Sequence, residues 1–280
     1  MSFESICRDI KSLKIQGARN VAIAGIKALS FKRDKKSIQK LLNLRSTEPA
    51  LRNSVKFVLR NFSDDYKKAL NHFKDSDKKI SKIGSKLIKN NTVVFTHCHS
   101  SSVVNVLKEA KKQGKKFRVN VTETRPLFQG RITAKELNRA KIKVTLFVDS
   151  ALENAIEESD IVLIGADAII SDKKNKEVVG VYNKIGSGVI SEIAFNRNVP
   201  VYVCSDSWKF NPYTLLGKKE VIEERSPTEV WRTSLVIKIR NPAFEIVKAK
   251  FIKGIVCELG NLSVKNFVKR VLKEYTWMLK

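Results

Sequence analysis

The amino-acid sequence predicts an α/β protein in which an all-helical first domain precedes a domain built on a mostly parallel sheet. Two observations lead to this prediction. Up to about residue 88 the apolar residues recur at helical spacing, and no convincing strand precedes Thr92. From Thr92 onward, short β-branched runs alternate with helical stretches, which is typical of parallel strands joined by right-handed helical crossovers. We therefore predict a helical domain over residues 1–88 and a sheet domain over residues 89–280.

The elements of both domains follow from the spacing of their apolar residues. In the first domain, the apolar residues of 21–29 and 55–59 lie on single helical faces. In the second domain, the predicted strands are Val93–Phe95, Phe117–Val121, Val144–Val148, Ile161–Ile164 and Val201–Val203. The predicted helices are Val103–Lys112, Ala134–Ala140, Leu152–Glu158, Ile185–Asn196 and a final one within Leu262–Lys280. This alternation is Rossmann-like.

Composition excludes several classes of protein. Of 280 residues, 42% are hydrophobic, which is enough to bury a core and excludes a disordered basic tail. No run reaches the ~20 apolar residues of a membrane span, and the first residues lack a secretory pattern, so we expect a cytoplasmic protein without a membrane partner. The four cysteines are far apart and form no C-x-x-C, so reduced thiols are expected.

The chain is strongly basic, with 54 Lys and Arg against 28 Asp and Glu. Residues 1–90 carry 22 basic and 8 acidic side chains, so the first domain is the more cationic part. Such a field attracts nucleic acid, an acidic protein or a multiply phosphorylated small substrate. Lysines that only solvate helices are an equally good explanation, so charge alone decides nothing.

Polar segments follow the predicted strands at their carboxyl ends, where parallel sheets bind ligands. These segments are Thr96-His-Cys-His-Ser100, Thr122-Glu-Thr-Arg-Pro126, Val148-Asp-Ser150, Gly165-Ala-Asp-Ala168 and Cys204-Ser-Asp-Ser-Trp-Lys209. A shared polar cleft explains why every buried strand continues into such a segment.

Cofactor sites are not expected. The sequence has neither a G-x-G-x-x-G after the first strand nor a P-loop, which disfavours dinucleotide binding and NTP hydrolysis. His97, Cys98 and His99 are consecutive at a strand end, so their side chains alternate in direction and do not readily converge on one metal ion.

Two residues of the predicted cleft are candidates for proton transfer. Cys98 precedes the expected start of a helix, whose amides and dipole favour a thiolate; the alternative is a buried core cysteine. Asp167 follows an apolar strand, and partial desolvation would raise its pKa toward neutrality. A helix N-cap is an equally good explanation for Asp167.

Other residues are candidates for holding phosphate and sugar oxygens. Asn183 and Lys184 open a helix in which Gly186 and Gly188 let the backbone approach a ligand, although an ordinary cap and a surface lysine fit as well. The phosphate-binding candidates by charge and context are Arg19, Arg45, Arg125 and Lys209, each of which could instead form a surface ion pair.

The sequence resembles one known family over nearly its whole length. The segments that carry the resemblance are Ile15-Gln-Gly-Ala18, Arg45-Ser-Thr-Glu-Pro49, Thr96-His-Cys-His-Ser100, Val121-Thr-Glu-Thr-Arg-Pro126, Gly165-Ala-Asp167, Asn183-Lys-Ile-Gly186, Trp208-Lys-Phe210 and Asn241-Pro-Ala-Phe244. This family contains the regulatory alpha, beta and delta subunits of translation initiation factor 2B, methylthioribose-1-phosphate isomerase and archaeal ribose-1,5-bisphosphate isomerase. The stretch from Thr96 to Pro126 is most similar to the last of these.

The resemblance implies an enzyme. Family isomerases carry a cysteine and an aspartate in the motifs that here hold Cys98 and Asp167, whereas the regulatory subunits typically lack that pair. By resemblance, Cys98 transfers the C2 proton of ribose 1,5-bisphosphate and Asp167 serves ring opening and the oxygen protons. Substrate would be bound by Gly17, Ala18, Arg19, Arg45, Arg125, Asn183, Lys184 and Lys209. The product, ribulose 1,5-bisphosphate, belongs to AMP metabolism in archaea.

The resemblance also implies a homo-oligomer, a dimer or a hexamer, with a phosphorylated pentose as substrate and neither metal nor other cofactor. The alternative is a non-catalytic regulatory subunit that binds a translation factor or a nucleotide through the cationic first domain. Nonspecific RNA binding by residues 1–90 is a third possibility, which we do not favour.

Overall fold

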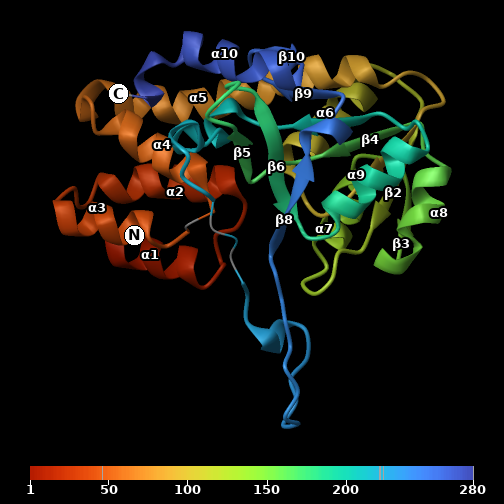
Figure 1. Cartoon of the computed structure of the whole chain (residues 1–280), viewed down its shortest axis with the longest axis horizontal. Helices are drawn as coiled ribbons and strands as arrows, with labels where there is room; N and C mark the ends of the chain where they lie inside the picture. Colours follow the sequence, from red (N-terminus) through yellow and green to blue (C-terminus); the bar gives the residue numbers. More distant parts are fainter. Residues whose placement is uncertain (46, 221, 223, 280) are drawn as a thin grey trace.

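The computed structural model describes residues 1–45, 47–220, 222 and 224–279, so Ser46 of the first-domain motif lies outside the described residues. The amino-terminal part is helical, as predicted (Figure 1). Its helices are α1 (Phe3–Lys11), α2 (Ala18–Leu29), α3 (Lys35–Leu42), α4 (Pro49–Val58) and α5 (Phe62–Gly84). Ser2 caps α1 and Asp34 caps α3 through side-chain oxygens, while α4 begins at a proline.

A seven-stranded sheet fills the second part, in the order β10-β9-β7-β4-β1-β2-β3. Its strands are β1 (Val93–Thr96), β2 (Arg118–Thr122), β3 (Lys143–Phe147), β4 (Ile161–Ile164), β7 (Val201–Cys204), β9 (Gly254–Cys257) and β10 (Gly260–Leu262). Neighbouring strands are parallel except for the β10–β9 pair. The helices beside this sheet are α6 (Ser101–Lys112), α7 (Gln129–Arg139), α8 (Leu152–Glu157), α9 (Ser187–Asn196) and α10 (Val264–Glu274). The predicted α/β class and mostly parallel sheet are confirmed.

A second sheet was not predicted. It is antiparallel and consists of β5 (Ala168–Ser171), β6 (Val178–Lys184) and β8 (Phe244–Lys248). Because β6 runs to Lys184, the following helix begins at Ser187, two residues later than predicted. The final helix is also shorter than the predicted segment, and a short 3-10 turn, Thr276–Met278, follows it.

One apolar core runs through the helical part and the sheet. It contains Val21 and Leu51 from the helices together with Phe95 and Val203 from the strands, all fully buried. Helix α5 packs against both α6 and β9. The division of the chain into two domains at residue 88 therefore stays a prediction.

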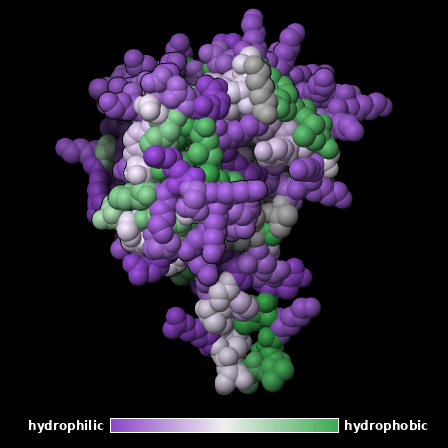
Figure 2. All heavy atoms as spheres, turned by 90° about the vertical axis from the view of Figure 1, so that its left-hand side faces the viewer, coloured by the Kyte–Doolittle hydropathy of each residue, from purple (hydrophilic) through white to green (hydrophobic). Residues whose placement is uncertain are grey.

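An arm, described over residues 217–220, 222 and 224–243, extends away from the rest of the molecule before the chain returns through β8 (Figure 1). Apolar atoms gather at the end of this projection, while the adjoining surface is mainly hydrophilic (Figure 2). The exposed apolar residues of the arm include Trp231, Leu235, Val236 and Ile237. Among the described helices, none has the length and apolar character that crossing a membrane requires.

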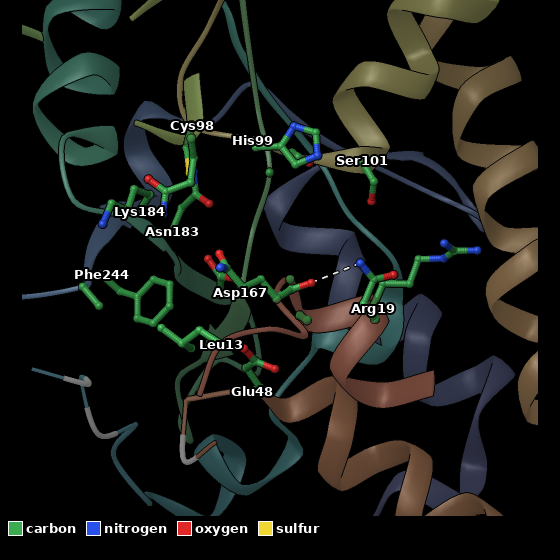
Figure 3. A pocket seen from close by; sticks show the side chains of 18 of the residues that line it. Leu13, Arg19, Glu48, Cys98, His99, Ser101, Asp167, Asn183, Lys184 and Phe244 are labelled. Carbon is green, nitrogen blue, oxygen red and sulfur yellow. Dashed lines mark hydrogen bonds between the residues drawn. The ribbon is translucent and has the colours of Figure 1, made fainter. Parts of the chain in front are cut away.

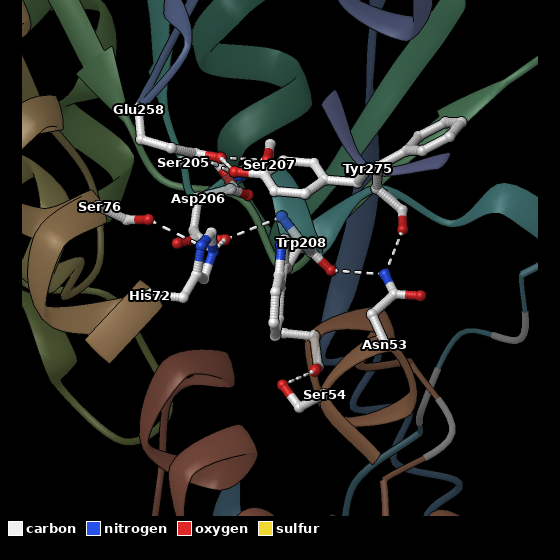
Figure 4. Close-up of polar contacts among 12 residues, drawn as sticks. Asn53, Ser54, His72, Ser76, Ser205, Asp206, Ser207, Trp208, Glu258 and Tyr275 are labelled. Carbon is white, nitrogen blue, oxygen red and sulfur yellow. Dashed lines mark hydrogen bonds and ion pairs between the residues drawn. The ribbon is translucent and has the colours of Figure 1, made fainter. Parts of the chain in front are cut away.

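A buried asparagine joins helix α4 to the segment after β7. Asn53 Nδ2 donates hydrogen bonds to the carbonyl oxygens of Trp208, at 2.7 Å, and Phe210, at 2.8 Å (Figure 4). The Trp208 ring is fully buried and contacts the rings of Phe57 and Trp277. Asn53 therefore fixes the position of the 3-10 turn Ser207–Lys209 against the helical part.

Replacing Asn53 by alanine should lower the free energy of unfolding by about 2–4 kcal/mol, because two buried carbonyl groups lose their donor. Urea denaturation monitored by circular dichroism measures the change. Asn266→Ala is the matched control, since the Asn266 side chain is exposed on α10 and its removal should change stability by less than about 0.5 kcal/mol. Equal stability of both variants would contradict the assigned role of Asn53.

Candidate active site

A pocket of about 420 Å³ lies at the carboxyl ends of β1 and β4, where the helical part meets the sheet. Its walls include the start of α2, the segment after β1, the segment after β4 and the end of β6 (Figure 3). Nine of the ten site residues expected from the sequence line it: Gly17, Ala18, Arg19, Arg45, Cys98, Asp167, Asn183, Lys184 and Lys209. Of the five polar segments predicted to share a cleft, 96–100, 165–168 and 204–209 contribute to this pocket, whereas 122–126 and 148–150 supply none of its lining residues.

Arg125 is the expected site residue that the structure does not bring into this pocket. Its side chain is exposed, and Nη2 donates a hydrogen bond to the carbonyl oxygen of Val230 in the arm at 3.1 Å. Its guanidinium also lies over the Phe128 ring. In this structure Arg125 supports the base of the arm.

The backbone of Cys98 is held in the left-handed region, with φ of 65°. Such a backbone conformation is unfavourable for any residue other than glycine, and it persists only where neighbouring groups enforce it. Here the Cys98 amide donates to Thr124 Oγ1 at 2.9 Å, and its carbonyl accepts from Thr133 Oγ1 at 2.8 Å. Two threonines from separate segments thus fix the direction of the thiol.

The surroundings of Cys98 disfavour the thiolate that the nearby helix start was expected to favour. Burial raises the pKa of the Cys98 thiol to about 12 and the negative charge of Asp167 adds to this rise, while the Lys184 ammonium opposes it. The nearby helix start does not outweigh desolvation. Figure 3 shows Cys98, Asn183 and Lys184 on one side of the pocket, with Asp167 facing the same space.

Asp167 lies between two strands. The chain passes from β4 through Gly165 and Ala166 to Asp167, whose amide donates to the Tyr182 carbonyl at 2.8 Å. Because Asp167 leads directly into β5, it does not cap a helix, and that alternative is excluded. Gly165 must be small, since a Cβ there would lie 2.7 Å from Ser100 Oγ.

The two histidines beside Cys98 have separate structural partners. His97 Nε2 donates to the Ile185 carbonyl at 2.9 Å, so Nδ1 accepts from Thr122 Oγ1 at 2.6 Å. Burial lowers the pKa of His97, which keeps the ring neutral. His99 Nδ1 instead lies 3.0 Å from Thr133 Oγ1. The His97 ring also explains Gly186, because a Cβ there would lie 3.0 Å from Nε2.

The start of helix α2 forms one wall of the pocket. Its N-cap is Gly17, with φ of 81°, and within the described chain no side chain caps this helix. Amides at such a helix start bind phosphate well, because the helix dipole places positive charge there. Arg19, on the first turn, holds Asp77 at 2.8 Å and contributes a cation.

Three further cations reach the pocket from buried positions. Arg45 is 7% exposed and pairs with Glu48 at 2.7 Å. Lys209 Nζ donates to the carbonyl oxygen of Ala166 at 2.6 Å. Burial lowers the pKa of Lys184. Since these groups are largely shielded from water, their attraction for a phosphate is stronger than that of surface cations.

The start of helix α9 is not available to an anion, contrary to the expectation for Gly186 and Gly188. The carboxylate of Glu245 on β8 accepts hydrogen bonds from the Gly186 amide at 2.6 Å and from the Gly188 amide at 2.8 Å. Asn183 Nδ2 donates to Ser187 Oγ at 2.9 Å, which fixes its side chain at the pocket edge.

The arm supplies lining residues that sequence reasoning missed. Arg225 and Glu229 pair with each other and both line the pocket. Asn241 Nδ2 donates to Glu229 Oε2 at 3.2 Å. An Arg-x-x-x-Glu pair in a loop looks like an ordinary surface ion pair, so nothing in the sequence connects it with Cys98.

A buried polar cluster lies beside the 3-10 turn that carries Lys209, and no sequence motif predicted it (Figure 4). Within the described chain, His72, Asp206 and Glu258 are the group whose spacing would suit a metal ion, with ligand atoms within 4.8 Å of one another. Hydrogen bonds engage most of the polar atoms of these three side chains, although Asp206 Oδ2 is buried without a hydrogen-bond partner among the described residues. His72 Nε2 pairs with Asp206 Oδ1 at 3.1 Å, and Glu258 accepts from Tyr275 and Ser207. We therefore interpret the cluster as structural.

Burial and the neighbouring Asp206 carboxylate shift the pKa values of His72 and Glu258 in this cluster. Burial favours the neutral His72 ring, but the Asp206 carboxylate outweighs it and raises the pKa of His72. Burial, with the charge of Asp206, raises the pKa of Glu258. The 3-10 turn that carries Lys209 begins at this point, since Asp206 Oδ1 accepts from the Trp208 amide at 2.8 Å.

Comparisons with known proteins agree with this geometry. Residues 14–264 match the model of the initiation factor 2 subunit family. The chain is 35% identical to ribose 1,5-bisphosphate isomerase of Archaeoglobus fulgidus, over 90% of this chain and 86% of that protein. It is also 35% identical to ribose 1,5-bisphosphate isomerase of Methanocaldococcus jannaschii, over 97% of this chain and 94% of that protein.

A solved structure gives the same fold. Translation initiation factor eIF-2B of Pyrococcus horikoshii OT3 superposes with a TM-score of 0.83 at 25% identity, over 93% of this chain and 96% of that one. The arrangement of helices and sheets is therefore shared with the solved relative. From the family match and the extent of both sequence likenesses, the chain belongs to the initiation factor 2 subunit family.

Proposed function

We propose that this chain is an aldose–ketose isomerase that converts ribose 1,5-bisphosphate into ribulose 1,5-bisphosphate. The observation that carries the proposal is one pocket lined by a thiol, Cys98, a carboxylate, Asp167, and several cations. Relatives of that name, at 35% identity over most of the chain, support the choice of substrate. A scaffold would have no need of a thiol and a carboxylate in one pocket.

The cations of the pocket suit a sugar with two phosphates. One phosphate binds the amides at Gly17 and Ala18 with Arg19, and the buried Arg45 and Lys209 supply further positive charge. Asn183 and Lys184 orient the sugar oxygens beside Cys98 and stabilise negative charge that develops on them.

Two acid–base groups are enough for the reaction. Asp167 protonates the ring oxygen as its bond to C1 breaks, and Cys98 removes the proton from C2. The C2 hydroxyl then loses its proton to Asp167 while the Cys98 thiol returns its proton to C1, which leaves the ketone at C2 and restores both groups. The phosphates stay in place throughout, and a pocket that excludes water protects the enediolate from phosphate elimination.

The thiol must lose its proton before it can act as a base. Its high pKa makes the thiolate scarce, and the groups that favour the thiolate are the His99 backbone amide and, to a smaller extent, the Lys184 ammonium. The scarce thiolate is correspondingly basic, which suits removal of a carbon-bound proton.

The competing class is a regulatory subunit that binds a translation factor, and the fold shared with eIF-2B is compatible with it.

A direct assay distinguishes an isomerase from a regulatory subunit. Purified chain incubated with ribose 1,5-bisphosphate should give ketose product, detected by NMR, and should give less with methylthioribose 1-phosphate. Turnover should persist in EDTA, because neither acid–base group needs a metal. Absence of product from both sugars would favour the regulatory class.

Cys98→Ser should reduce kcat by about 10²–10⁴-fold, the usual contribution of a positioned acid–base group, with KM little changed. The kcat of Asp167→Asn should fall by a similar factor. Steady-state kinetics on the purified variants measures both effects. Normal turnover in either variant would remove that residue from the mechanism.

The control is Cys7→Ser, because Cys7 is buried in α1 away from the pocket and its variant should keep normal turnover. The pH profile gives a second readout. Since the pKa of Cys98 is raised to about 12, the thiolate fraction grows roughly tenfold per pH unit above neutrality. The ratio of wild-type kcat/KM to that of Cys98→Ser should therefore rise with pH, because both enzymes use the same protonated Asp167 and differ only in the group at position 98.

We also propose that the chain acts in the cytoplasm as a homo-oligomer, a dimer or a hexamer. The exposed apolar residues at the end of the arm support association. Light scattering of the purified chain should give two or six times the monomer mass of 31.7 kDa. A stable monomer at micromolar concentration would contradict the proposal.

A further inference from the structure

We propose that the amino-terminal edge of the seven-stranded sheet binds the phosphate backbone of a single-stranded nucleic acid. A second cavity, of about 470 Å³, lies at this edge, opposite the carboxyl ends that form the active site. It is lined by Asn91, Lys111, Lys116, Phe117, Arg118, Lys141 and Lys143. Five of these seven side chains are cationic and none is acidic.

The surrounding segments extend this charge. The three stretches 86–92, 111–118 and 139–143 come together at the edge, and they contain ten basic and no acidic residues. The basic residues are Lys86, Lys89, Lys111, Lys112, Lys115, Lys116, Arg118, Arg139, Lys141 and Lys143. Across the described parts of the chain, no ion pair joins any of the ten to a carboxylate. We call this set the amino-edge patch.

Hydrogen bonds hold the patch in shape. Lys115 Nζ donates to the Ser85 carbonyl at 2.6 Å, and the Asn91 amide donates to the Lys116 carbonyl at 2.6 Å. Arg118 and Lys143 are register partners on the adjacent strands β2 and β3, so the sheet itself places two cations side by side. Like charges at such short separation repel, and a polyanion would relieve this repulsion.

The shape of the site favours a single strand. A cavity of about 470 Å³ has the size of sites for small ligands, so it can admit a nucleotide unit but not a duplex. Phe117 is half-buried in its wall and offers a ring on which a base can stack. Lysines outnumber arginines in the patch, and lysine attracts phosphate as a point charge without reading sequence.

This location differs from the one that composition suggested. The first domain as a whole is basic, but several of its cations pair with carboxylates, including Arg19 with Asp77 and Arg60 with Asp65. The amino-edge patch, in contrast, combines a cavity with cations that, among the described residues, form no ion pair with a carboxylate. It also lies apart from Cys98 and Asp167, so it is independent of the proposed isomerase activity.

Fluorescence anisotropy with a labelled oligouridylate of about 12 nucleotides tests the proposal on the full chain. The triple variant Lys116→Gln, Lys141→Gln, Lys143→Gln should bind at least roughly tenfold more weakly than wild type at low salt. Its slope of log affinity against log salt should be shallower by about 2, near 0.7 for each lost phosphate contact.

The matched control removes the same charge from another exposed face, by Lys265→Gln, Lys269→Gln and Lys273→Gln on α10. It should keep wild-type affinity and slope. Phe117→Leu should weaken binding of oligouridylate but not of inorganic polyphosphate. Circular dichroism should show that all variants are folded.

Three results would overturn the proposal. The first is an equal loss of RNA affinity in the two triple variants. The second is wild-type RNA binding that does not depend on salt concentration. The third is that polyglutamate displaces the RNA as effectively as unlabelled RNA does. The last result would indicate an acidic protein as the partner. Isomerase activity in the amino-edge variant should equal that of wild type, so failure here leaves the proposed function untouched.

Discussion

The ion pair between His72 and Asp206 joins the helical part of the chain to the sheet, and the geometry of the pocket depends on it. Asp206 is almost completely buried, and a buried carboxylate is tolerated only beside a positive charge and hydrogen-bond donors. His72 supplies that charge from α5, and the Trp208 amide supplies a donor. The same 3-10 turn carries Lys209 into the pocket, while α5 also carries Asp77, which holds Arg19. Two cations of the pocket that are far apart in sequence, Arg19 and Lys209, are thus positioned from one buried pair.

Burial has opposite effects on the two kinds of group in the pocket. It raises the pKa of the Cys98 thiol, which keeps the sulfur protonated, and it strengthens the attraction between buried cations and an anionic ligand. The same burial that favours anion binding therefore holds the cysteine in the less reactive form. The left-handed backbone at residue 98 compensates in part, because two threonines fix the direction of the thiol before substrate arrives.

The local sequence pattern was sufficient to predict those features of the fold that depend on residues close together in the chain. The parallel sheet followed from alternation of β-branched and helical runs, and the cleft followed in part from the polar residues after the strands. What was missed depends on distant segments. Glu245 occupies the amides of α9 from about 60 residues away, and Arg225 reaches the pocket from the arm. The second sheet was missed because β6 leads straight into the segment interpreted as a helix start. The protonated thiol depends on burial, which spacing does not report.

Helix α9 begins at the pocket edge with its amides already taken by a carboxylate, whereas α2 begins there without a side-chain cap among the described residues. The two helix starts therefore act oppositely on an anion, one attracting it and the other excluding it. A sugar with phosphates at both ends thus meets walls that are not equivalent. For the bisphosphate proposed as substrate, we therefore expect that the two ends are not interchangeable and that one direction of the carbon chain brings C2 to the sulfur.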